Sequence, residues 1–237
     1  MKKTILTALA AIFLSFAAPA QNDALLDKAR RAYSNGEWAS ATALYGVYCD
    51  REPGLTEAYA RRMLASELIA DTITSTAVIE EAMHAEVGAP ALFAAFRASA
   101  FETGHPEAFP TLLKRARGSL SWLARPIDAA LLDFYKFRND PAQTEEYART
   151  LLAGLPDDTG YLATLAESLL MQGKNKEALD TYARILEIDP RDFDALVSLG
   201  TYWLDEGDTA KARDYLTRAA EIRTSPALRQ TLDRLGK

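Results

Sequence analysis

A turn residue recurs along this chain at a nearly fixed interval. Neighbouring positions lie 34 residues apart, with one step of 35 residues between Gly104 and Asn139. A residue just past a helix end often adopts a left-handed conformation, which glycine reaches without steric cost. An interval of this length predicts stacked helix-turn-helix units rather than one globular core. The six positions are Gly36, Ala70, Gly104, Asn139, Gly173 and Gly207.

The residues around each glycine follow a second pattern. A small residue stands five positions after the glycine, where two helices must cross closely, and a large apolar residue follows four positions later. A proline, which cannot continue a helix, closes the unit. Before the glycine, apolar residues spaced by three, one and three positions share one helical face. The residues are Ala41, Ala178 and Ala212; Tyr45, Tyr182 and Leu216; Pro53, Pro156 and Pro190; and Leu162, Leu165, Ala166 and Leu169 with Leu196, Leu199, Gly200 and Trp203.

This constellation resembles the tetratricopeptide repeat. The resemblance is strong over residues 159–226, good over 22–55 and degenerate over about 56–124. It implies an all-α fold, a right-handed α-α superhelix of about six helix-turn-helix units. A capping helix that starts at Ser225-Pro226 and carries Leu228, Leu232 and Leu235 on one face is expected to close the array.

The middle of the chain departs from the pattern in particular places. Ser75 and Phe109 occupy the small-residue position of the second and third units. Pro106 and Pro110 lie near the start of the second helix of the third unit. Because proline removes a helical hydrogen bond beyond the first turn, we expect that helix to be short or shifted.

Residues 1–20 are predicted to be a cleaved secretory signal peptide. Lys2 and Lys3 precede an apolar run over residues 5–16, and Ala18-Pro19-Ala20 resembles a cleavage site before Gln21. The alternative, a permanent membrane anchor, is disfavoured because the run is shorter than the roughly 20 apolar residues of a spanning helix. We therefore expect a single domain over residues 21–237, in the periplasm or, alternatively, secreted.

The charge balance disfavours nucleic acid as a partner. Without the signal peptide, 25 basic residues face 33 acidic residues, a net charge of −8. Nucleic acids and anionic lipids demand clustered lysine and arginine. One basic cluster is present, and we favour a solvated helix face over a phosphate or acidic-partner site for it. It comprises Lys114, Arg115, Arg117 and Arg125.

Few residues are candidates for catalysis or metal binding. His84 follows Glu80 and Glu81 at helical spacing, but a surface ion pair is more common than a metal site there. His105 follows a turn glycine and is better placed for a turn. Cys49 is the only cysteine, and we favour a buried hydrophobe over a reactive or intermolecular thiol. We predict no enzyme activity, no metal and no cofactor.

The tetratricopeptide resemblance implies a groove lined by the outward side of each first helix. Tyr33 and Phe101 could instead be core, and Arg30 and Arg61 solvated surface. Trp122 is expected to be a staple between units, or else an exposed anchor. The groove positions transferred from the family are Arg30, Tyr33, Arg61, Leu64, Ala94, Ala98, Phe101, Asp133, Lys136, Glu167, Met171, Thr201 and Asp205.

These features predict a non-enzymatic scaffold in a bacterial cell envelope that binds a protein or peptide in its concave groove. Two alternatives stay open. One is an enzyme or metal-dependent accessory protein that uses residues 104–125 with His84 or His105. The other is a self-associating structural protein, joined through its first unit or through Cys49.

Overall fold

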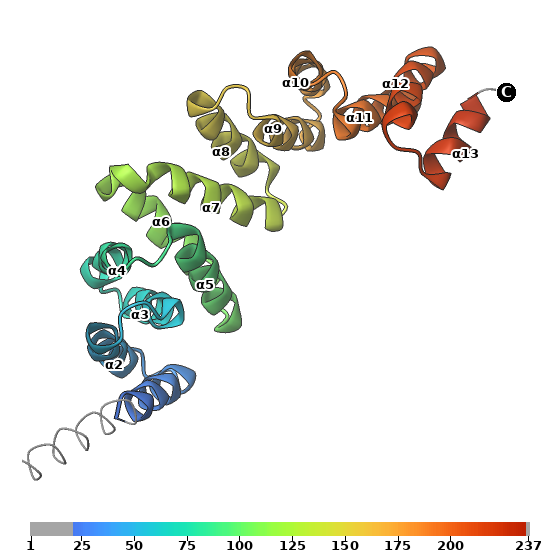
Figure 1. The fold of residues 1–237 in the computed structure, drawn as a ribbon. Coiled ribbons are helices and arrows are strands. Elements are labelled where there is room, and N and C mark those ends of the chain that lie inside the picture. The colour runs from blue at the N-terminus through green and yellow to red at the C-terminus, as the bar shows by residue number, and fades with distance from the viewer. Residues whose placement is uncertain (1–20, 236–237) are drawn as a thin grey trace, which may run out of the picture. The chain divides into compact units, whose positions relative to one another are not determined.

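A computed structural model describes residues 21–235, and this part of the chain consists of α-helices, one short 3₁₀ helix and turns, without a strand (Figure 1). The all-α prediction is confirmed: six helical hairpins follow one another and a thirteenth helix closes the chain. The elements are a helix over residues 21–34, α2 (Trp38–Arg51), α3 (Thr56–Leu68), α4 (Thr72–His84), α5 (Ala89–Glu102), α6 (Ala108–Ser119), η1 (Ser121–Leu123), α7 (Ala124–Phe137), α8 (Pro141–Gly154), α9 (Thr159–Met171), α10 (Asn175–Ile188), α11 (Phe193–Asp205), α12 (Thr209–Ile222) and α13 (Pro226–Leu235).

The chain divides into two compact units, and the boundary lies inside α7, between Ala130 and Leu131. Unit 1 comprises the described residues up to Ala130, and unit 2 comprises the described residues from Leu131 onwards. Each unit is described by itself below. The predicted signal peptide, residues 1–20, lies outside the described residues.

The recurring turn position has a left-handed backbone in all six hairpins. The φ angle is positive at the four glycines, and it is also positive at Ala70 (59°) and Asn139 (56°). An alanine in this conformation places its Cβ close to the following carbonyl oxygen, at a cost of about 1–2 kcal/mol. The hairpin geometry therefore overrides the local preference of the residue at Ala70. The four glycine φ angles are 75° at Gly36, 77° at Gly104, 72° at Gly173 and 80° at Gly207.

Small residues allow the two helices of a hairpin to approach closely. Ala41, Ala178 and Ala212 have no solvent-accessible surface. Gly200 in α11 is another such position, because an added Cβ there would lie 2.6 Å from Cγ of Leu216 in α12. Such a distance is far below van der Waals contact, so any larger residue would push the helices apart.

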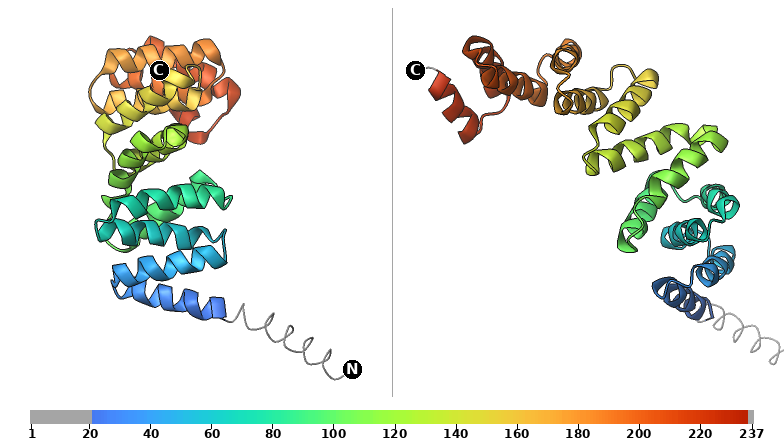
Figure 2. Two further views of the ribbon diagram at one scale, coloured as in Figure 1. Left: turned by 90° about the vertical axis from the view of Figure 1, so that its left-hand side faces the viewer. Right: turned by 180° about the vertical axis from the view of Figure 1, so that it is seen from behind.

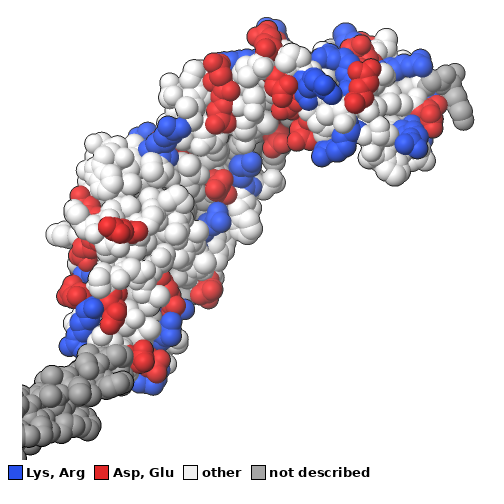
Figure 3. Space-filling view, in the orientation of Figure 1, with Lys and Arg blue, Asp and Glu red and all other residues white. Residues whose placement is uncertain are grey.

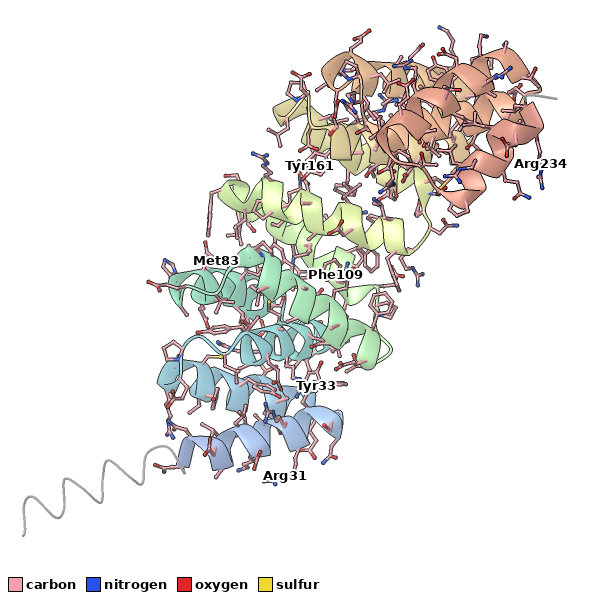
Figure 4. All side chains as sticks on the ribbon, turned by 45° about the vertical axis from the view of Figure 1, so that its right-hand side comes forward. Arg31, Tyr33, Met83, Phe109, Tyr161 and Arg234 are labelled. Atoms are coloured by element: carbon pink, nitrogen blue, oxygen red, sulfur yellow. The ribbon has the colours of Figure 1, made fainter. Side chains whose placement is uncertain are left out.

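The third hairpin shows the expected displacement of its second helix. α6 begins four residues after its turn glycine, whereas the corresponding helices of the other hairpins begin two residues after theirs. Pro110 lies in the first turn of α6, where its missing N–H is tolerated. Phe109 fills the small-residue position and is fully buried (Figure 4). A displaced helix thus accommodates a large side chain at this position.

The capping helix is present as predicted. Ser225 Oγ accepts a hydrogen bond from the backbone N–H of Leu228, which caps α13 at its start. Leu228 is buried against Leu196 and Leu216, and Leu232 and Leu235 pack at the edge of the same cluster. α13 therefore covers the apolar face of the last hairpin.

Candidate functional site

The predicted groove residues in unit 1 are largely engaged in its own packing. Leu64 has no accessible surface and Tyr33, labelled in Figure 4, retains 5% of its surface, so both are core residues. The prediction that Leu64 lines the groove is therefore wrong. For Tyr33, two roles were open, groove and core, and its burial favours the core. Phe101 is half-buried, whereas Ala94 and Ala98 are exposed. Unit 1 thus presents mainly small side chains from the predicted set.

Arg30 and Arg61 share one carboxylate, that of Glu57. Arg30 donates two hydrogen bonds to it, at 3.1 and 2.9 Å, and Arg61 Nη1 lies 2.9 Å from Glu57 Oε1. The Arg61 guanidinium also lies over the Tyr33 ring, 5.2 Å from its centroid. Burial raises the pKa of Tyr33 to about 12, an effect that Ser99 and Arg61 only partly offset. These two arginines hold helices together and are not free surface charges.

All six predicted groove residues of unit 2 are exposed. They lie on α7, α9 and α11, the first helices of the last three hairpins. Figures 1 and 2 show α9 and α11 along one side of unit 2, with α10 and α12 along the other. We call this set the unit 2 face. It comprises Asp133, Lys136, Glu167, Met171, Thr201 and Asp205, together with Phe137.

The face repeats with the period of the hairpins. Asp133, Glu167 and Thr201 occupy one position in three successive helices, each 34 residues after the last. Four residues later, the second position holds Phe137, Met171 and Asp205. Residues four apart lie on the same side of a helix, so each helix contributes one pair. In α7 and α9 the pair is a carboxylate and a large apolar side chain.

A pocket of about 200 Å³ lies within this face, between the end of α7, the start of α8 and α9. It brings together three predicted residues: Lys136, Glu167 and Met171. Lys136 Nζ donates a hydrogen bond to Thr164 Oγ1 at 3.1 Å. A pocket of this size accommodates roughly one side chain of an incoming chain.

Three buried hydroxyl groups line the floor of the pocket. Thr144, Thr164 and Ser168 are nearly inaccessible, and each donates its proton to a helix carbonyl, at 2.7, 3.0 and 2.8 Å respectively. Their oxygens therefore present lone pairs as acceptors. Sequence reasoning did not identify this floor, although Thr144 occupies the small-residue position five residues after Asn139. The presence of threonine, a polar residue, at this core position was the one feature of the sequence that could have indicated the pocket.

The carboxylates of the face have no ionic partner. Within residues 21–235, no basic side chain lies within 4.0 Å of Asp133, Glu167 or Asp205, and none of the three side chains takes part in a hydrogen bond. Large apolar side chains accompany them: Met171 is 55% exposed and Phe137 is 70% exposed. Unpaired charge and exposed apolar surface on one face are features of an interaction site.

The other carboxylates show how unit 2 uses charge elsewhere. Glu145 accepts hydrogen bonds from Lys174 Nζ at 2.6 Å, Gln172 Nε2 at 2.8 Å and Arg149 Nε at 2.9 Å. Burial alone would raise the pKa of Glu145, but these three donors lower it to about 2. Basic and acidic side chains stand next to one another over the C-terminal surface seen in Figure 3. Glu145 is therefore neutralised internally, unlike the carboxylates of the unit 2 face.

The residues singled out for chemistry do not come together. His84 and His105 are exposed, and His105 packs edge-on against Trp38 with ring centroids 6.3 Å apart. Glu81, one candidate partner of His84, is paired with Arg62. Across the described residues, no group of three or more His, Cys, Asp or Glu side chains is placed to hold a metal ion. The metal-dependent alternative gains no support from this geometry.

Cys49 is buried, with 4% of its surface exposed, and burial raises the pKa of its thiol to about 12. The thiolate is the reactive species, so this group is inert in the folded protein. The prediction that Cys49 is a buried hydrophobic residue is thus confirmed, and its burial gives no support to self-association through this thiol. Self-association, through Cys49 or through the first hairpin, stays a prediction.

Two further expectations need correction. Trp122 is 61% exposed in η1, so it is an exposed side chain and not a staple between hairpins. The basic cluster is not a uniformly solvated face, because two of its members are paired with carboxylates. Arg115 binds Glu67, and Arg117 binds the buried Asp128.

None of the helices in the described part of the chain is both long enough and apolar enough to cross a membrane. This finding applies to residues 21–235 and does not include the predicted signal peptide.

Comparison with known families identifies the repeat. A sequence model described as tetratricopeptide repeat matches residues 129–192 and again residues 163–227. The two matches begin 34 residues apart, which is the interval of the turn residues. The matched region, 129–227, coincides closely with unit 2. Residues 129–227 therefore carry the tetratricopeptide repeat, in agreement with the residue pattern of the last hairpins.

Solved structures resemble the chain at low sequence identity. A tetratricopeptide repeat protein from Parabacteroides merdae is 13% identical, with 96% of this chain and 89% of that chain covered and a TM-score of 0.47. The pilF protein of Pseudomonas aeruginosa is 13% identical, with coverages of 92% and 99% and a TM-score of 0.48. The APC/C hetero-tetramer Cut9-Hcn1 is 12% identical, with coverages of 93% and 46% and a TM-score of 0.50. At 12% identity, the similarity to Cut9-Hcn1 concerns the fold alone. A search of curated proteins found no match.

Proposed function

We propose that this protein is a non-enzymatic interaction scaffold of the cell envelope, and that the unit 2 face binds a segment of a protein partner. One observation carries the proposal. On α7 and α9, unpaired carboxylates stand beside large exposed apolar side chains, at positions that repeat every 34 residues. A regularly repeated set of side chains suits an extended or helical segment, because such a segment also presents side chains at a regular spacing.

The pocket beside Lys136 supports recognition of a polypeptide. Its hydroxyl oxygens carry lone pairs that can accept hydrogen bonds, and the Lys136 ammonium, which already donates to Thr164 Oγ1, has further N–H donors. A peptide backbone carries both kinds of group, so the pocket complements it on both counts. Met171 adds an adaptable apolar contact, since its thioether side chain fits surfaces of irregular shape. Binding is therefore the role that these groups serve best.

Location in the envelope rests on the sequence of residues 1–20. Two lysines, an apolar run and a small-residue motif are the parts of a secretory signal. Export would bring the scaffold to partners in the periplasm or, alternatively, outside the cell. Cell fractionation, with and without these residues, tests this part of the proposal.

The function is tested by photo-crosslinking in intact cells. A photoreactive amino acid is placed at Met171 or Thr201 on the unit 2 face, and at Ile188 on α10 as the control, because Ile188 is also exposed. We expect one discrete crosslinked protein from positions 171 and 201 and none from 188. The same product from all three positions, or no product from the two face positions, would contradict the proposal.

A further inference from the structure

We propose that the segment recognised by the unit 2 face is basic and carries a large apolar side chain between its lysine or arginine residues. The inference rests on the proposed function and names the chemistry of the partner. Lysine or arginine would pair with Glu167 and its neighbours Asp133 and Asp205, while the apolar side chain would lie on Met171.

Charge is the first argument. The face carries three carboxylates, Asp133, Glu167 and Asp205, against one ammonium group, that of Lys136. Lys136 is held by the hydroxyl of Thr164 and forms no ion pair within the described part of the chain. The carboxylates are therefore left for an external cation. Charge complementarity of this kind selects partners more than it adds raw affinity.

Unpaired carboxylates alone would not define a site, because the outer helices of unit 2 have them too. Asp180, Glu187 and Glu221 are exposed and unpaired among the described residues. The second argument is therefore the apolar surface. Met171 follows Glu167 by four residues, and Phe137 follows Asp133 by four. Charge and apolar area thus alternate on a single face, which a partner with the same alternation would cover.

The pocket supplies the third argument. Its hydroxyl floor presents acceptors, and Glu167 lies at its edge. An ammonium or guanidinium group entering between them would donate protons to both. Lys136 remains as the donor for a backbone carbonyl of the same segment. An acidic segment would leave the hydroxyl acceptors unused and would be repelled by the three carboxylates.

Binding is measured by fluorescence anisotropy with the full chain and four labelled peptides of equal length. The first alternates lysine and leucine, and the others replace lysine by glutamine, lysine by glutamate, or leucine by serine. We expect the lysine-leucine peptide to bind at least about tenfold more tightly than the other three. Its affinity should fall as salt rises, because exposed charges are screened.

Two triple variants with equal charge change separate the face from general attraction to an acidic protein. The face variant is Asp133→Asn, Glu167→Gln and Asp205→Asn. The control variant, on the outer helices, is Asp180→Asn, Glu187→Gln and Glu221→Gln. We expect about tenfold weaker binding for the face variant and less than about twofold for the control. Met171→Ser should weaken binding of the lysine-leucine peptide without changing its dependence on salt.

Equal weakening by the two triple variants would overturn the inference, since only net charge would then matter. Equal or tighter binding of the glutamine or glutamate peptide at the face would also overturn it, while the proposed scaffold function would stand. Conversely, tight binding of the lysine-leucine peptide at the face, with no crosslinked protein from position 171 in cells, would support the chemistry and contradict the scaffold function. The two failures are thus distinguishable.

Discussion

Within each unit the turns have the same geometry, but the two units differ in how side chains cap their helices. In unit 2, aspartate side chains cap α8, α9, α11 and α12, and Ser225 caps α13. In unit 1, only α4 has a side-chain cap among α2 to α6, and it is provided by Asp71. Ion pairs connect helices in both units, for example Arg30–Glu57 and Arg115–Glu67 in unit 1 and Arg149–Glu177 in unit 2. What distinguishes unit 1 is that its ion pairs connect helices most of which lack a side-chain cap.

Arg115 shows how the degenerate repeats remain folded. From α6 it reaches Glu67 of α3 with two hydrogen bonds, and it also donates to Ser75 Oγ in α4 at 2.9 Å. Ser75 occupies the small-residue position, so a hydroxyl replaces the alanine and becomes part of the ionic contact. In unit 1 the hairpin geometry is thus kept although the repeat pattern is lost, and a charge network connects α3, α4 and α6 there.

The largest effect is expected from Ala178→Trp in unit 2. Ala178 has no accessible surface, and a tryptophan there would force α9 and α10 apart. We expect a loss of about 3 kcal/mol in the free energy of unfolding of unit 2. Hydrogen exchange, resolved by helix, measures the change, and Ala183→Trp at an exposed site in the same helix is the control. Unchanged protection of α9 and α10 would contradict close packing as the basis of this unit.

Arg115→Ala should have the next largest effect, and in unit 1. It leaves the Glu67 carboxylate, whose side chain is 10% exposed, without its cation. Because Arg115 itself is partly exposed, we expect a loss of about 2 kcal/mol, below the range for fully buried pairs. Arg125→Ala, at an exposed position, serves as the control and should change stability little. Equal stability of the two variants in urea unfolding would show that the network does not hold unit 1.

Glu145→Gln tests how much a charged group contributes to the stability of unit 2, because the Glu145 carboxylate accepts hydrogen bonds from three side chains of that unit. Its pKa is lowered from 4.5 to about 2, so its ionised form stabilises the native state fully above pH 4.5. We expect the variant to lose about 1 kcal/mol at pH 7, and the difference from the parent protein to shrink as pH falls from 4.5 to 2. Stability is measured by urea unfolding at several pH values, with Glu146→Gln as the exposed control. A difference that is constant with pH would exclude ionisation as its cause.

The smallest effect should have the opposite sign. Ala70 has a φ angle of 59°, where glycine avoids the clash of the alanine Cβ. Ala70→Gly should therefore stabilise unit 1 by about 0.5–1 kcal/mol, after the entropy lost by glycine on folding. Thermal unfolding of the variant measures this gain. Loss of stability would mean that the turn is not strained at this position.

The sequence predicted the fold because one geometric requirement repeats. A left-handed turn residue every 34 or 35 positions places the helix boundaries, and Ala70 and Asn139, which are not glycine, also have this conformation. The displaced start of α6 was predictable from Pro106 and Pro110, since proline restricts where a helix can begin. These features depend on local backbone chemistry, which a single sequence contains.

The positions transferred from the family are exposed as a set only in unit 2, where the repeat pattern is regular. In unit 1 the transferred position at Leu64 is fully buried. Whether the unit 2 positions bind a partner stays a prediction. The pairs Arg30–Glu57 and Arg117–Asp128 join different helices, and helical spacing does not indicate them; only the Glu57–Arg61 pair has the i,i+4 spacing of one helix. Phe137 was missed because an aromatic side chain on a helix is usually buried, yet it is 70% exposed.

The most direct test of the unit 2 face uses the methionine methyl groups as probes. The chain has four methionines; Met63 is fully buried and Met83, labelled in Figure 4, is half-buried, both in unit 1, whereas Met171 is exposed on the unit 2 face. The protein, labelled with ¹³C at its methionine methyl groups, is titrated with the lysine-leucine peptide and followed by NMR. We predict that the Met171 signal shifts progressively to saturation while the signals of Met63 and Met83 stay in place. An unmoved Met171 signal at saturating peptide, or equal shifts at Met83, would contradict the assignment of the binding site to this face.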